Sequence, residues 1–285
     1  MAHLKSRATR LYRDLRSVIR QPMLAPAGHY YSPLTTHEDG ARALGWTEAG
    51  LGLSSVNIDL DAMGLLAEDL APMWPDLALS ERYRRDAMYE LSDAAVYHSM
   101  LRKFNPSKVI EIGSGFSTAV ALDTIDKHDL GTEITCIEPH PARLQALLRP
   151  NDRITLIEDL VQNVPLSTFD SLSAGDFLFI DSTHVVKAGS DVVWTTLRVL
   201  PRLKPGVMVH IHDMFWPLEY QEKWLLQRRD WNEIYMIHAY LSGNSSWRVL
   251  FFSDQVWQSR RELVSANLPD GVEQRPGGLW LIREA

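Results

Sequence analysis

The amino-acid sequence predicts an α/β protein with a doubly wound, mostly parallel seven-stranded sheet and a helical N-terminal extension. Strand-like and helix-like segments alternate from residue 108 onward, which is the rhythm of repeated β-α-β units. The segment 176–180 is nearly all apolar, as expected for a strand covered on both faces. A glycine-containing turn joins the first strand to a helix-like segment, which is typical of the ligand-binding edge of such sheets.

Apolar runs, helical spacing and turn residues define the expected elements. The expected strands comprise residues 109–112, 133–137, 154–157, 176–180, 207–211, 247–252 and 278–282. The expected helices comprise residues 59–74, 86–104, 119–124, 141–148, 190–203, 220–241 and 255–266. Frequent prolines and glycines predict that residues 21–55 lack long elements. We therefore expect an extension over residues 1–90, serving as a lid or an oligomer contact, and a ligand-binding sheet domain over residues 91–285.

Composition restricts the classes of partner. The chain has 285 residues and a formal net charge of −7, which argues against general nucleic-acid binding because phosphates require a basic surface. Its single cysteine, Cys136, excludes an intramolecular disulfide and fits a reducing compartment. No apolar run is long enough to span a bilayer, and no secretory segment is visible. We expect a cytoplasmic protein that acts on a small molecule.

The first twenty residues form a basic amphipathic pattern. Leu4, Leu11 and Leu15 recur near helical spacing among arginines, with Asp14 as the acidic exception. Such a helix can lie on an anionic membrane surface. The pattern equally fits a helix packed on its own domain or on a second copy of the chain. We favour the packed helix, because a short helix without a bulky aromatic anchor binds membranes weakly.

Polar residues follow each of the five parallel strands. Ligands bind outside the carboxyl ends of such strands. The strand ends carry Gly113-Ser-Gly115, Glu138-Pro139, Glu158-Asp159, Asp181 and His212-Asp213. A carboxylate at Glu138 can accept both hydroxyls of a ribose, and Asp159 is placed to meet an adenine edge. The strand ends together predict a site for an adenosine-containing cofactor.

The glycine turn favours S-adenosylmethionine over a dinucleotide. Gly113 and Gly115 allow a ligand to approach the backbone closely, at the N-terminus of the following helix. Thr118 occupies the place of the third glycine in the dinucleotide fingerprint. Glu111 adds negative charge that disfavours a pyrophosphate and suits an amino group or a sulfonium.

Several motifs resemble those of a known family. Glu111-Ile-Gly-Ser-Gly115, Glu138 and Leu203-Lys-Pro-Gly206 resemble the motifs of class I S-adenosylmethionine-dependent methyltransferases, over residues 93–285. Phe179-Ile-Asp-Ser-Thr-His184 and His210-Ile-His-Asp213 resemble the branch with the macrocin and mycinamicin sugar O-methyltransferases and the cephalosporin hydroxylase-like proteins. The resemblance implies a Rossmann-like fold and methyl transfer to oxygen.

The resemblance also implies a set of site residues. The implied cofactor-binding residues are Glu111, Gly113, Ser114, Gly115, Ser117, Glu138, Asp159 and Asp181. In this branch, acids after the fourth and fifth strands hold a divalent cation such as Mg²⁺ or Mn²⁺, which assigns Asp181, His212 and Asp213 as metal ligands. His212 stands where the pattern has a carboxylate, and imidazole suits softer metals than Mg²⁺.

His184 and Asp181 are the expected catalytic residues. Some members of the branch place a general base three residues after the first acid, which is the position of His184. A base with a pKa near neutral suits a hydroxyl that loses its proton as it attacks a methyl group. Alternatively, His184 is a structural histidine bonded to a loop carbonyl. We expect His212 to face the site, with His210 structural and on the opposite side of the sheet.

The favoured function is O-methylation of a small molecule or a sugar hydroxyl. Three alternatives stay open. The same sheet could serve an oxidoreductase of the NAD type, which Glu111 and Thr118 disfavour. His184 and His212 with carboxylates could serve a metal-dependent oxygenase or hydroxylase. The chain could also be a non-catalytic module that binds an adenosine ligand.

Overall fold

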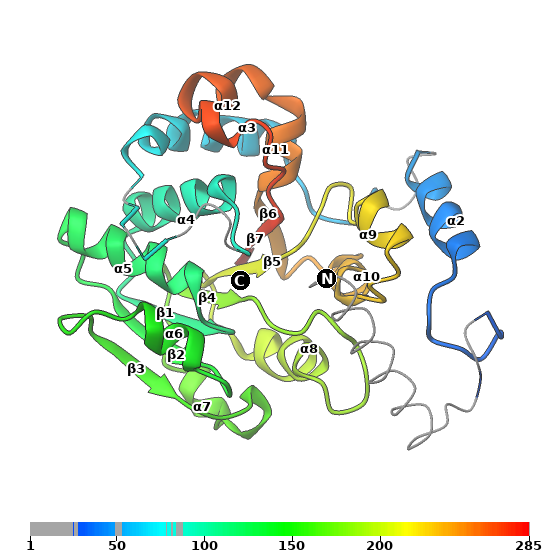
Figure 1. Cartoon of the computed structure of the whole chain (residues 1–285), viewed down its shortest axis with the longest axis horizontal. Helices are drawn as coiled ribbons and strands as arrows, with labels where there is room; N and C mark the ends of the chain where they lie inside the picture. The colour runs from blue at the N-terminus through cyan, green and yellow to red at the C-terminus, as the bar shows by residue number, and fades with distance from the viewer. Residues whose placement is uncertain are drawn as a thin grey trace, which may run out of the picture. The chain divides into compact units, whose positions relative to one another are not determined.

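The computed structural model describes residues 25, 28–48, 53–77, 79–80, 82–83 and 88–284. The basic segment 1–20 lies outside these residues, so the prediction for it is not addressed. The chain divides into two compact units, one of residues 1–46 and 221–230, the other of residues 47–220 and 231–285. Figure 1 shows that the second unit contains the whole sheet, with helices packed around it.

The second unit is built on a seven-stranded sheet of order β3-β2-β1-β4-β5-β7-β6. Its strands are β1 (Lys108–Ile112), β2 (Glu133–Ile137), β3 (Ile154–Ile157), β4 (Phe177–Ile180), β5 (Met208–His212), β6 (Trp247–Phe252) and β7 (Gly278–Arg283). The strands β1 to β5 are parallel, and β7 lies antiparallel between β5 and β6. Every residue of β4 and β5 is buried. This arrangement confirms the predicted doubly wound fold.

Helices surround this sheet. The α-helices of the second unit are α3 (Leu60–Leu70), α4 (Leu91–Phe104), α5 (Phe116–His128), α6 (Ala142–Leu147), α7 (Leu166–Phe169), α8 (Asp191–Trp194), α10 (Glu233–Leu241), α11 (Ser253–Ser259) and α12 (Arg261–Asn267). Asp59 caps α3 by accepting the N–H of Ala62. Asn105 ends α4 and Asp129 ends α5, both in the left-handed conformation. Within the described part of the chain, no helix combines the length and apolar character needed to cross a membrane.

The first unit contains α9 (Glu222–Leu226) and most of α2 (His37–Glu48). The last two residues of α2 lie beyond Trp46, where this unit ends. The prediction that residues 21–55 lack long elements was therefore wrong. Thr36 and Asp39 form a reciprocal capping pair, because each side chain accepts the backbone N–H of the other. Gly40 also packs closely on α9, since a Cβ there would lie 3.4 Å from Leu225 Cβ.

Three predicted helices are interrupted in the structure, and the helix predicted over residues 86–104 begins only at Leu91. Residues 220–241 form α9 and α10 with a break between them, where Arg228 and Asp230 adopt positive φ. Residues 255–266 form α11 and α12, which meet at Arg260. Residues 190–203 begin as α8 and continue as a π turn and a 3₁₀ turn. Hydrophobic periodicity does not register such breaks.

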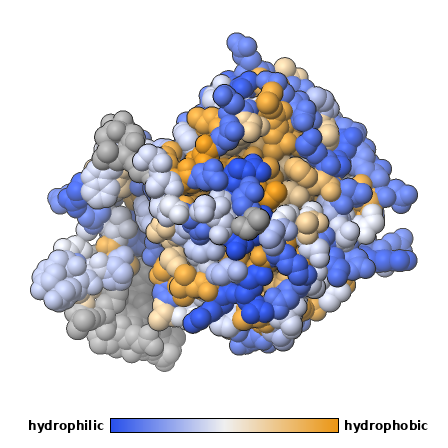
Figure 2. All heavy atoms as spheres, turned by 180° about the vertical axis from the view of Figure 1, so that it is seen from behind, coloured by the Kyte–Doolittle hydropathy of each residue, from blue (hydrophilic) through white to orange (hydrophobic). Residues whose placement is uncertain are grey.

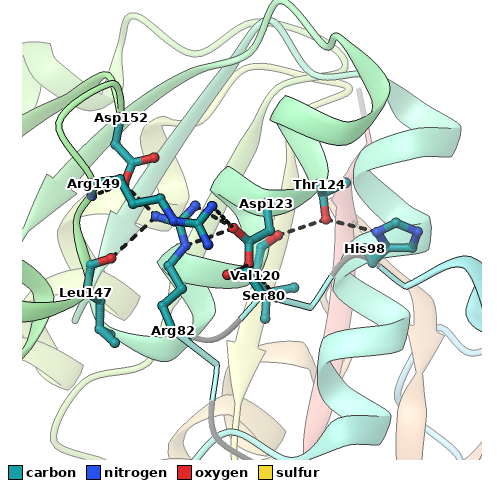
Figure 3. A network of polar contacts seen from close by, with 9 residues as sticks. All are labelled: Ser80, Arg82, His98, Val120, Asp123, Thr124, Leu147, Arg149 and Asp152. Atoms are coloured by element: carbon teal, nitrogen blue, oxygen red, sulfur yellow. Dashed lines mark hydrogen bonds and ion pairs between the residues drawn. The ribbon is translucent and has the colours of Figure 1, made fainter.

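A buried ionic network fixes the segment before α4 against α5 (Figure 3). Arg82 donates from Nε (2.8 Å) and Nη2 (2.5 Å) to Oδ1 of Asp123, and from Nη1 to Asp152 (2.5 Å). Ser80 donates its hydroxyl to the other oxygen of Asp123 at 2.6 Å. The Arg82 side chain is 6% exposed and that of Asp123 4% exposed. The guanidinium of Arg82 and the carboxylates of Asp123 and Asp152 are thus buried together.

The surface outside this network mixes polar and apolar residues. On the face drawn in Figure 2, hydrophobic residues lie among hydrophilic ones. Several large hydrophobic side chains are exposed, and Tyr30 (81%), Met88 (76%) and Tyr31 (68%) are the most exposed of them. Met88 matters for the site, because it also lines a cavity at the sheet edge.

Candidate functional site

Two cavities lie at the carboxyl ends of the parallel strands. The first, of about 350 Å³, is lined by the glycine turn and by residues that follow β2, β4 and β5. The second, of about 410 Å³, is lined by residues that follow β2, β3 and β4. Gly113, Glu138 and Asp181 line both. The strand ends that the sequence singled out therefore meet at one edge of the sheet.

Gly113 is a position where only glycine fits. Its φ is +78°, and an added Cβ would lie 2.7 Å from the carbonyl carbon of Asp181 and overlap the carbonyl oxygen. Its N–H donates to the Ile137 carbonyl (3.0 Å), while the Asp181 N–H donates to the Ile112 carbonyl (2.9 Å). The turn therefore continues the hydrogen bonding between neighbouring strands up to the cavity.

Glu138 is held by backbone donors at the junction of the two cavities. The Ser114 N–H donates to one carboxylate oxygen (3.1 Å) and the His140 N–H donates to the other (2.8 Å). These bonds fix the carboxylate while leaving lone pairs for a ligand. The position suits the ribose-binding role that the sequence predicts.

Glu111 lies beneath the glycine turn and does not line either cavity. Ser117 donates its hydroxyl to the Glu111 carboxylate at 2.6 Å, and Thr118 donates to the other oxygen. Gly115, at the start of α5, donates its N–H to the Thr118 hydroxyl. Burial raises the pKa of Glu111 to about 7, although these hydroxyl donors oppose the rise. In this structure Glu111 supports the turn from below.

Asp159 is exposed and also lies outside the lining of both cavities. Its carboxylate accepts the N–H of Leu160 and the side-chain amide of Asn163, each at 2.7 Å. The next residues, Leu160, Val161 and Gln162, line the second cavity instead. The apolar pair Leu160 and Val161, directly after the strand-end acids, was not weighed from the sequence.

His184 lies among three carboxylates. Its Nδ1 is 2.9 Å from Glu233 Oε2, while Nε2 is 3.3 Å from Asp213 Oδ2 and 3.5 Å from Asp181 Oδ1. Its own carbonyl accepts the N–H groups of Asn232 and Glu233, so the start of α10 is attached to this loop. Sequence reasoning missed Glu233, because nothing local connects residues 49 positions apart.

The carboxylates favour the charged form of His184. Burial alone would lower the pKa of this imidazole, but Asp181, Glu233 and Asp213 outweigh it and raise the pKa well above the ordinary value. Burial likewise opposes ionisation of Asp181, and His212 and His184 nevertheless hold its pKa below the ordinary value. The charges around His184 therefore favour its imidazolium form.

This charge predicts a pH-dependent stability. A histidine whose pKa is higher in the folded state stabilises the fold below its unfolded pKa of about 6.5, and the contribution is lost as pH rises through the folded value. We expect the difference in unfolding free energy between wild type and His184→Gln to shrink as pH rises from about 6. Urea unfolding across this range measures it. His140→Gln, an exposed histidine of the same cavity, is the control, and a constant difference for His184→Gln would contradict the assignment.

Asp181, His212 and Asp213 form a group that could hold a metal ion, with one donor atom of each within 4.8 Å of the others. His212 is buried, and its Nδ1 has no hydrogen-bond partner among the described residues. Two carboxylates and one imidazole form a donor set that suits Mn²⁺ better than Mg²⁺. The raised pKa of the nearby His184 favours its charged form, which opposes a further cation, so a metal at this site remains a prediction.

His210 lies on the same side of the sheet as His212, contrary to the sequence-based expectation. Residues two apart in a strand share a face, and the two ring centroids are 5.8 Å apart. The contacts of His210 are nevertheless those of a structural residue in the core, as expected. Its ring stacks on Phe179 with centroids 4.2 Å apart, and burial holds its pKa well below the ordinary value.

A second group of possible metal donors comprises Asp76, His98 and His128. Here the carboxylate of Asp76 already accepts from Arg102 at 3.1 Å and from Lys127. Two cations beside a single carboxylate leave little attraction for a metal ion. We assign this group to ion pairing between α4, α5 and the turn that carries Asp76.

The family model described as "Methyltransferase domain" matches residues 110–214, which contain the last three residues of β1, all of β2 to β5 and the strand ends that line both cavities. The chain carries a methyltransferase domain. The match over these residues agrees with the resemblance to class I S-adenosylmethionine-dependent methyltransferases that the sequence motifs indicated.

Individual relatives of this methyltransferase domain are distant. An uncharacterized protein of Archaeoglobus fulgidus is 36% identical over 94 residues, which are 32% of this chain and 42% of that protein. The chain thus aligns with less than half of that relative. The SAH-bound methyltransferase PaMTH1 of Podospora anserina is 15% identical, with 93% of this chain and 100% of that chain covered and a TM-score of 0.46. The O-methyltransferase TomG of Streptomyces achromogenes, in complex with SAM, is 15% identical, with 77% and 90% covered and a TM-score of 0.42.

Proposed function

We propose that this protein transfers the methyl group of S-adenosylmethionine to an oxygen atom of a small molecule, such as a sugar hydroxyl. The observation that carries the proposal is the methyltransferase domain over residues 110–214, whose strand ends line both cavities. The backbone-held carboxylate of Glu138 supports it, because it is placed to accept the ribose hydroxyls of the cofactor. The acceptor class follows the family resemblance.

In this proposal the two cavities bind different parts of the cofactor and the acceptor. The second cavity takes the adenine ring against Leu160 and Val161, and Glu138 at the junction takes the ribose. The first cavity takes the methionine end beside Gly113 and Gly115, together with the acceptor. Tyr89 and Trp231 line the same cavity and supply apolar surface for the acceptor.

The reaction is a direct displacement. The acceptor oxygen forms a bond to the methyl carbon while the carbon–sulfur bond breaks, and the hydroxyl proton leaves to a base. Under the proposal His184 is that base. Asp181, Glu233 and Asp213 raise the pKa of His184, and only its neutral form accepts a proton, so turnover should increase as pH rises above neutral.

A divalent cation fits the donor set at Asp181, His212 and Asp213, where the orphaned Nδ1 of His212 is the observation in its favour. When bound there, it would supply positive charge that makes an acceptor hydroxyl more acidic.

The role of residues 1–90 as a lid or oligomer contact also remains a proposal.

Calorimetry tests the cofactor. We expect S-adenosylmethionine and S-adenosylhomocysteine to bind and NAD not to bind, each measured with and without Mn²⁺ and Mg²⁺. Glu138→Gln should weaken binding of both adenosyl compounds by about 10- to 100-fold, because a charge-assisted hydrogen bond contributes about 1.5–3 kcal/mol. Glu133→Gln is the matched control on β2, with an exposed side chain remote from the strand end. Binding of NAD without binding of S-adenosylmethionine would refute the proposed function.

A further inference from the structure

Arg143 is a cation in the first cavity that the proposed reaction does not use. It lies in the first turn of α6 and lines that cavity. Its stem packs on the glycine turn, since a Cβ at Gly115 would lie 3.3 Å from Arg143 Cδ. Arg143 forms no hydrogen bond or ion pair with any residue that the structure describes. Arg149, just beyond the same helix, by contrast pairs with Asp123 at 3.4 Å.

The first cavity carries opposite charges on its two sides. Arg143 and the N-terminus of α5, which begins at Phe116 and carries the positive end of the helix dipole, lie at the glycine turn. Asp181 and Asp213 line the cavity from the ends of β4 and β5, and the His184 ring, within 3.5 Å of both carboxylates, compensates only part of their charge. A zwitterion with an ammonium and a carboxylate group matches this separation of charge.

We propose that Arg143 binds the α-carboxylate of the methionine end of the methyl donor, an inference that rests on the proposed function. A guanidinium presents two parallel N–H groups that match a carboxylate, and the lack of a side chain at Gly115 leaves room for the Arg143 stem against the turn. The ammonium group of the same amino acid then lies toward the carboxylates of the opposite side. Arg143 is in this view the residue that distinguishes the complete donor from analogues without a carboxylate.

Decarboxylated S-adenosylmethionine is the discriminating probe, because it keeps the adenosine, the sulfonium and the amine and lacks only the carboxylate. We expect wild type to bind S-adenosylmethionine about tenfold more tightly than the decarboxylated compound, the lower end for an exposed charge-assisted pair. Arg143→Gln should bind both compounds equally, with the decarboxylated compound bound as in wild type. Arg143→Lys should keep part of the preference.

The matched control is Arg153→Gln, which removes the same charge from an exposed residue that lines neither cavity and should keep the wild-type preference. An unchanged preference in Arg143→Gln would overturn the inference alone. If Arg143→Gln kept the wild-type binding preference and lost only turnover of an anionic acceptor, Arg143 would bind a carboxylate of the acceptor. That result would also overturn the inference. A wild type that binds neither compound would overturn the proposed function together with this inference.

Discussion

Replacing Gly113 with alanine should abolish measurable binding of S-adenosylmethionine and destabilise the fold. The added methyl group would overlap the backbone carbonyl of Asp181, which cannot move without breaking its own strand pairing to Ile112. Overpacking of this kind costs about 1–3 kcal/mol. The positive φ adds about 1–2 kcal/mol for any residue with a Cβ. Urea unfolding measures the stability, and calorimetry measures the binding.

Gly175→Ala separates the clash from the backbone strain. Gly175 has a similar φ of +91°, and a Cβ there would meet nothing within 4 Å. This variant should lose only the strain energy of about 1–2 kcal/mol and bind the cofactor as wild type does. Equal losses of stability and binding in the two variants would show that the contact with Asp181 is not what requires glycine at position 113.

Removing Arg82 should be the most destabilising single change outside the site. Arg82→Gln removes the buried cation of Asp123 and Asp152 and leaves Asp123 only the longer contact with the half-exposed Arg149, at 3.4 Å. Breaking a buried ion pair from one side costs about 3–5 kcal/mol. The loss should appear as a lower urea midpoint with an unchanged slope. Tyr83, the next residue, donates its hydroxyl to the Tyr89 carbonyl at 2.7 Å, so the wall of the first cavity should loosen as well.

Arg202→Gln is the control for this prediction. Arg202 also donates two hydrogen bonds to one aspartate, Asp170, but the two side chains are 46% and 37% exposed. Its loss should cost no more than about 1 kcal/mol, because water replaces an exposed ion pair. A comparable loss in the two variants would contradict the role of burial in the Arg82 network.

The sheet and its ligand-binding edge could be predicted from the sequence because buried parallel strands are short apolar runs followed by polar residues. Every predicted strand is present, with ends shifted by at most one residue. The α2 helix was not predicted because its glycines were taken as signs of irregular structure. The reciprocal cap of Thr36 and Asp39, which favours a helix start, was not considered. The break before α10 follows from hydrogen bonds to the His184 carbonyl, which no local pattern records.

The site was predictable in outline but not in its charge arrangement. Gly113, Glu138, Asp181 and His184 come together as expected, since strand order alone brings their positions to one edge. The inward turn of Glu111 depends on hydroxyl donors on the loop that follows it, and sequence reasoning weighed only its charge. Glu233 arrives from a distant helix, so the raised pKa of His184 could not be foreseen.

The attachment of α10 to the His184 loop has a consequence for altering the acceptor range. Trp231 lines the first cavity and directly precedes Asn232 and Glu233, whose backbone N–H groups are fixed by the His184 carbonyl. Because that anchor uses main-chain atoms, substitutions at Trp231 can reshape the cavity wall while the helix behind it keeps its place. Under the proposed function, a library of variants at this one position is therefore a practical way to search for new acceptors.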